Sequence, residues 1–118
     1  MEQFMLIFHG GADEAAFPSA DAMQAHMGKW IAWVDKLKKS NKYVSGEPLL
    51  PGGKLVSGPA GRSVTDGPYT EGKEVVGGYF IITAKDYDEA VDLIKADYPD
   101  FDLGGSVQVR QVMKMDES

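Results

Sequence analysis

The sequence contains no cysteine among its 118 residues. Disulfide bonds, thiolate nucleophiles and cysteine-ligated metal sites are therefore excluded. Long apolar runs are missing too, because no stretch approaches the roughly 20 residues that a membrane-spanning helix needs. Met1-Glu2-Gln3 is not the basic beginning of a signal peptide, and the apolar run Phe4–Phe8 is too short for its hydrophobic region. We expect a cytoplasmic protein with no membrane partner.

Positive charge is scarce as well. The chain has 12 Lys and Arg against 18 Asp and Glu, and its net charge is −6. Binding to a phosphate backbone requires concentrated positive charge, so we expect no nucleic-acid partner. No Gly-rich phosphate motif is present, and the two histidines and scattered carboxylates lack a metal-ligand spacing. We therefore expect no metal and no cofactor, in a single domain spanning residues 1–118.

Two apolar runs, Phe4–Phe8 and Tyr79–Ile82, are typical of strands covered on both faces. Helical periodicity runs from Ala20 to about Lys39, and a capping-box spacing at Asp86–Glu89 starts a second helix that ends near Ala96. Shorter strands are predicted within 43–50, 54–57, 62–65 and 106–115, the middle two forming a hairpin.

The first helix carries an apolar stripe that we expect to face the core. It contains Met23, Met27, Trp30, Ile31, Val34 and Leu37. His26 and Trp33 lie at one edge of this stripe, a turn apart on either side of Trp30.

The order β-α-β-(β hairpin)-β-α-β predicts an α+β fold, a ferredoxin-like split βαβ arrangement with an inserted hairpin. Both helices then cover one face of the sheet, and no element remains for the other face. The economical solution is a homodimer that stacks sheet on sheet as a dimeric α+β barrel. The competing solution is a monomer with a hydrophobic cleft for a small-molecule ligand on that face.

The stretch Val64-Thr65-Asp66-Gly67-Pro68-Tyr69 resembles the YCII-related family in its DGPF branch, where Phe usually stands in place of Tyr69. Nearly the whole chain shares the likeness. The matching segments are His26–Trp33, Gly46–Leu49, Gly77–Phe80, Asp88–Ala90 and Gly105–Arg110. The resemblance implies a ferredoxin-like fold and dimerisation, in agreement with the pattern of elements.

The resemblance also implies candidate chemistry. YciI-like relatives carry a His–Asp dyad in a cleft, and one related group eliminates chloride from a muconolactone-type substrate. The histidine of that dyad lies early on the first helix, which corresponds to His26. Its aspartate precedes a proline after the second helix, but here Tyr98 precedes Pro99, with Asp97 one residue earlier and Asp100 one later.

We expect His26 to be the catalytic acid/base, since a neutral imidazole can take up and return a proton near pH 7. Asp97 or Asp66 would orient it, although Asp66 is more simply a turn residue that accepts backbone N–H groups. The alternative for His26 is a helix-edge histidine bonded to a carbonyl or to water.

Four residues are candidates for ligand binding: His9, Trp30, Tyr69 and Tyr98. The leading hypothesis is a small cofactor-independent enzyme acting on a small organic acid or aromatic breakdown product. The alternative is a non-catalytic ligand-binding or regulatory module, in keeping with the sigma-factor genes that accompany some DGPF members. A monooxygenase of the antibiotic-biosynthesis type ranks last, because no motif favours it.

Overall fold

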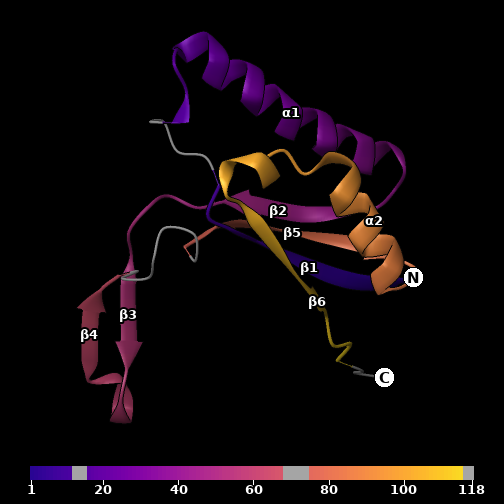
Figure 1. Ribbon diagram of the computed structural model, residues 1–118. Coiled ribbons are helices and arrows are strands. Elements are labelled where there is room, and N and C mark those ends of the chain that lie inside the picture. Colours follow the sequence, from indigo (N-terminus) through magenta and orange to yellow (C-terminus); the bar gives the residue numbers. More distant parts are fainter. Residues whose placement is uncertain (12–15, 68–74, 116–118) are drawn as a thin grey trace.

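The computed structural model describes residues 1–11, 16–67 and 75–115. Six strands and two α-helices follow one another along the chain (Figure 1). They are β1 (Glu2–His9), α1 (Ala20–Lys39), β2 (Tyr43–Pro48), β3 (Lys54–Ser57), β4 (Ser63–Asp66), β5 (Val76–Ala84), α2 (Tyr87–Asp97) and β6 (Ser106–Gln111). The described residues also include two single turns of 3-10 helix, η2 (Pro59–Gly61) and η4 (Phe101–Leu103).

The main sheet has the strand order β2-β5-β1-β6, and all neighbouring strands are antiparallel. β1 and β5, which contain the two long apolar runs, are its central pair. The strands β3 and β4 form a separate hairpin. In the sequence this hairpin lies between β2 and β5. The predicted α+β, ferredoxin-like fold with an inserted hairpin is confirmed. Within the described residues, no helix is long and apolar enough to cross a membrane.

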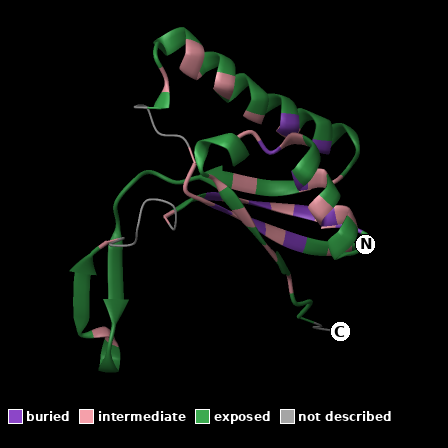
Figure 2. Ribbon diagram, in the orientation of Figure 1, coloured by how far each residue is buried: buried purple, intermediate pink, exposed green. Residues whose placement is uncertain are grey.

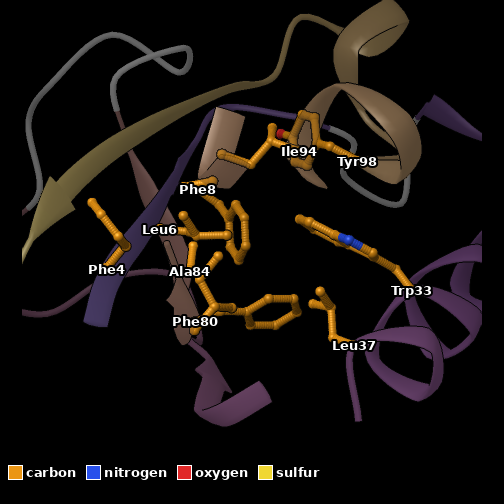
Figure 3. Packing of buried hydrophobic residues seen from close by; sticks show 11 residues of the cluster. Phe4, Leu6, Phe8, Trp33, Leu37, Phe80, Ala84, Ile94 and Tyr98 are labelled. Carbon is orange, nitrogen blue, oxygen red and sulfur yellow. The ribbon is translucent and has the colours of Figure 1, made fainter. Parts of the chain in front are cut away.

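Both helices lie on one face of the sheet (Figure 1). Alternate residues of the central strands are buried on that face, Phe4, Leu6 and Phe8 from β1 and Phe80, Ile82 and Ala84 from β5. Figure 3 shows Trp33 and Leu37 of α1 reaching toward these side chains, with Ile94 and Tyr98 closing the cluster. The period of two thus assigns one side of the sheet to the helices.

Both helix starts follow the sequence. The Ser19 Oγ accepts a hydrogen bond from the Ala22 N–H at 3.0 Å. The Asp86 Oδ1 accepts one from the Glu89 N–H at 2.9 Å, and the Glu89 Oε1 accepts one from the Lys85 N–H at 3.0 Å. These bonds satisfy N–H groups that a helix cannot pair internally, which fixes where α1 and α2 begin.

The buried face of α1 is rotated relative to the predicted stripe. Trp33, predicted at the edge, is 1% exposed and lies in the core, whereas Met27 and Ile31 are 56% and 68% exposed. The prediction for these three residues was wrong because the apolar residues of α1 span a wider arc of the helix than the arc that faces the sheet. The bulk of the Trp33 indole selects which part of that arc faces the sheet (Figure 3).

The β3–β4 hairpin differs from the rest of the molecule. All of its strand residues are exposed, and both of its strand arrows are green throughout in Figure 2. The last strand also departs from expectation, because β6 ends at Gln111 rather than Met115. The alternation of apolar residues breaks at Gln111 and Val112, and Met113 and Met115 beyond it are largely exposed.

Candidate functional site

The centre of the candidate site is a contact between His26 and Asp100. His26 lies in the second turn of α1, and Asp100 lies in the loop after α2 at the start of η4. The His26 Nε2 is 2.5 Å from the Asp100 Oδ1, and the two side chains are only 11% and 10% exposed. With the ring nitrogen protonated, the imidazole donates this hydrogen bond and the carboxylate accepts it.

Trp30 contacts the same carboxylate oxygen. One helical turn after His26, its Nε1–H donates to the Asp100 Oδ1 at 3.3 Å. The spacing of four residues places both donors on one side of α1, so the helix presents two N–H groups to a single acceptor. Trp30, predicted to bind a ligand, is thus placed within the site as a partner of Asp100.

The backbone encloses the Asp100 carboxyl group on its other sides. A Cβ on Gly11 would lie 2.6 Å from the Asp100 Oδ2, and a Cβ on Gly105 would lie 2.9 Å from the Asp100 Cβ. The Gly105 N–H also donates to the Asp100 main-chain oxygen at 2.9 Å. Asp100 is 7% exposed, with both glycine segments packed against it.

Tyr98 belongs to the aromatic cluster beside the pair. Its ring stacks on Phe8 with centroids 5.7 Å apart and meets the edge of Trp30 at 5.5 Å. Burial raises the pKa of the Tyr98 phenol, and the nearby Asp100 charge raises this pKa further. Tyr98, predicted to bind a ligand, is only 6% exposed and is a neutral wall of the core.

Two residues of the site were not among the predicted site residues. Asp100 was noted only as a neighbour of the expected position, and Phe17 was not singled out. The Phe17 ring lies 5.0 Å from the His26 ring, just before the Ser19 cap of α1. An apolar ring in a loop next to a histidine is a weak sequence signal, because neither the period nor the spacing specifies the contact.

The carboxylates expected to orient His26 have other partners. Asp97 accepts a hydrogen bond from the Lys36 Nζ at 3.0 Å, and Asp66 pairs with Lys54 within the hairpin. Asp97 ends α2, so its side chain follows the helix surface, whereas Asp100 lies past Pro99 where the chain turns toward α1. The carboxylate that lies beside His26 is that of Asp100, whereas Asp97 and Asp66 each pair with a lysine.

Of the other predicted ligand residues, His9 has a described side-chain contact outside this pair. At the end of β1, the His9 Nε2 lies 3.2 Å from the Gln108 Oε1 on β6. Tyr69 falls outside the described residues. The site that the structure assembles thus consists of His26, Trp30 and Asp100, with Phe17 and Tyr98 as aromatic neighbours.

The sequence matches the model of the YCII-related domain over residues 3–116. The chain belongs to the YCII-related family. No curated protein matches it. A similar solved structure is the 5-chloro-2-hydroxyhydroquinone dehydrochlorinase (TftG) from Burkholderia phenoliruptrix AC1100, in complex with 2,5-dihydroxybenzoquinone. The two are 17% identical over 93% of each chain with a TM-score of 0.43, a likeness that carries no argument about function.

In this YCII-related protein a hollow of about 430 Å³ lies next to the pair, between α1 and the end of α2. Its lining includes Lys29 and Trp33 from α1 and Asp97, Tyr98 and Pro99 from the other side. His26 and Asp100 do not line it, although each is close in sequence to residues that do. In the described part of the chain, no cluster of three or more His, Asp or Glu side chains could hold a metal ion.

Proposed function

We propose that this YCII-related protein is a small cofactor-independent enzyme in which His26 transfers a proton and Asp100 positions it. The observation that carries the proposal is the 2.5 Å contact between the His26 Nε2 and the Asp100 Oδ1 in a largely buried setting. A histidine held by a buried carboxylate is an arrangement suited to general acid/base catalysis.

His26 and Asp100 have different roles in this proposal. Nε2–H donates to the carboxylate, so Nδ1 is the ring nitrogen that takes a proton from an acidic C–H or O–H group of the substrate. The Asp100 charge stabilises the imidazolium that forms, and Trp30 keeps the carboxylate in place. The same nitrogen then returns the proton, so the protein leaves the cycle unchanged.

The aromatic surroundings support the proposed substrate class. Phe17 lies against the His26 ring, and the Trp30 indole, one helical turn after His26, contacts the Asp100 carboxylate. Flat, apolar walls next to a proton-transfer group favour an aromatic or unsaturated substrate over a sugar or a phosphate ester. A small organic acid or an aromatic breakdown product fits this description.

The proposal includes a homodimer formed by stacking of the uncovered sheet faces. On this face the central strands place Met5, Ile7, Tyr79 and Ile81 at neighbouring positions, Met5 opposite Ile81 and Ile7 opposite Tyr79. Four adjacent apolar or aromatic side chains facing away from the helices form a surface that a second copy would bury.

Proton exchange in heavy water tests the acid/base role without knowledge of the complete reaction. A panel of hydroxylated aromatic and enolisable organic acids is incubated with the protein in D2O, and loss of C–H signals is followed by proton NMR. We expect His26→Gln to slow exchange of the responsive compound by about 100-fold or more. Asp100→Asn should slow it less and shift its pH profile, because the imidazolium loses its counter-charge.

Matched controls come from exposed positions on the same two helices. Gln24→Ala on α1 and Asp92→Asn on α2 should leave the exchange rate unchanged. Exchange that continues at the wild-type rate in His26→Gln would refute the role of His26.

The enclosure of the pair favours one second candidate, a ligand-binding or regulatory module in which His26 and Asp100 simply join α1 to the loop after α2. This reading gains if compounds of the panel bind, as seen by changes in the protein NMR spectrum, while none of them exchanges protons.

A further inference from the structure

Among the described residues, no other helix or strand buries the β3–β4 hairpin. All of its strand residues are exposed, and the apolar Leu55, Val56 and Val64 are 58%, 60% and 58% exposed. An isolated two-stranded ribbon is marginally stable at best in water. The hairpin therefore needs a surface from outside the chain if its strands are to persist.

The register of the hairpin creates one apolar face. Val56 pairs with Val64, and Lys54 pairs with Asp66 two residues along each strand, so these four side chains share a side of the ribbon. The other side carries the Leu55–Thr65 and Ser57–Ser63 pairs. An apolar pair flanked by the Lys54–Asp66 ion pair has the apolar centre and charged rim of an interface.

The hairpin is placed beside the uncovered face of the sheet. In Figure 1 the helices lie above the sheet, and the hairpin extends below it, away from the helices. A body stacked on the uncovered face, where Ile7 and Tyr79 lie opposite each other, would therefore have the hairpin at its side.

The exposed surface of the chain is large enough for an interface with another protein. The chain exposes 8323 Å², whereas a compact protein of its mass exposes about 6300 Å². The difference, about 2000 Å², exceeds the roughly 800 Å² that each partner loses in a stable interface. The radius of gyration is likewise large, 16.3 Å against about 13.5 Å for a compact chain of this length.

We propose that the β3–β4 hairpin is an arm that packs against a second copy of this chain through its Val56–Val64 face. A twofold stack of the sheets would cover both apolar faces and give the two arms identical surroundings, which no unrelated partner does. The inference rests on the homodimer of the proposed function and is independent of the proton-transfer role of His26.

Charge placed on the arm tests the contact. The double variant Val56→Lys/Val64→Lys changes side chains that are exposed in the single chain, so the circular dichroism spectrum should remain that of the wild type. Its dimer dissociation constant, from sedimentation velocity over a concentration series, should rise by at least about tenfold. The control Ser57→Lys/Ser63→Lys adds the same charge to the opposite side of the ribbon and should have a smaller effect.

Because the chain has no cysteine, a single introduced cysteine can test directly whether Val56 lies against a second copy of the chain. Val56→Cys, coupled to a benzophenone maleimide and irradiated, should give a covalent two-chain product, whereas Lys39→Cys at the exposed end of α1 should not. A dimer that shows neither the crosslink nor the weakening overturns the arm and leaves the stacked dimer intact. A protein that stays monomeric at all concentrations overturns both, with the acid/base role of His26 unaffected.

Discussion

The surroundings of Asp100 and the β3–β4 hairpin differ most in how far their side chains are buried. Around Asp100, side chains and glycine backbones from β1, α1 and the loop before β6 leave the carboxylate almost no free surface. In the hairpin, the strands pair only with each other and every strand residue faces outward. Contacts within the chain bury the first region, whereas the strand residues of the second are exposed in the described structure.

The largest difference between the two regions should appear on truncation of an apolar side chain. Trp33→Ala removes a ring that is 1% exposed and contacts Phe8, Phe80 and Tyr98, so the free energy of unfolding should fall by about 3–5 kcal/mol. Leu50→Ala, in the segment that leads to the hairpin and 90% exposed, should change it by less than about 0.5 kcal/mol. Urea unfolding measures both, and equal losses would contradict the contrast.

A second comparison isolates the fit of the backbone around Asp100. Gly11 and Gly52 have similar positive φ values, +93° and +89°, but only Gly11 would place a Cβ against the Asp100 carboxylate. Gly52→Ala should cost about 1–2 kcal/mol from backbone strain alone. Gly11→Ala should cost more and should shift the NMR signals of the His26 ring. Equal costs with an unmoved His26 signal would show that the fit at Gly11 is loose.

The smallest effect concerns pH and the start of α2. The Lys85 N–H, and after it the Lys42 ammonium, lower the pKa of Glu89. Because the folded pKa lies below the unfolded one, the stabilisation is complete above the ordinary carboxyl pKa, about 4.3, and is lost as the pH falls through the folded value. Glu89→Gln should therefore be less stable than wild type near neutral pH.

Urea unfolding of both proteins at neutral and acidic pH checks this prediction. The difference between them should narrow as the pH falls below about 4. A difference in unfolding free energy that stays constant with pH would mean that the Glu89 contacts do not depend on its charge.

Local patterns were sufficient to predict most of the fold. The continuous apolar runs at Phe4–Phe8 and Tyr79–Ile82 identified the central strands, and the capping-box spacing at Asp86 identified the start of α2. These features act over a few residues, so they can be read directly from the sequence. The rotation of α1 could not, because the choice between Trp33 and Ile31 depends on the space left by strands far away in the chain.

The histidine of the candidate site could be predicted from the sequence, but its carboxylate partner could not. The resemblance to YciI-like proteins pointed to His26 on the first helix, but the carboxylate partner of His26 lies 74 residues away in the sequence. Three aspartates lie within 97–102, and spacing alone does not distinguish them. The turn after Pro99 and the glycines at 11 and 105 determine which aspartate reaches α1, and these are properties of the assembled structure.

The position of β1 at the centre of the sheet has a consequence for synthesis of the chain on the ribosome. In the described sheet β1 pairs with β5 and β6, and roughly 65 residues separate the end of β1 from the start of β5. At about 5–20 residues per second, the apolar strand Phe4–Phe8 waits about 3 to 13 s for its first partner. During that interval the hairpin can already close, and the nascent chain exposes a segment that chaperones of the ribosome exit would recognise.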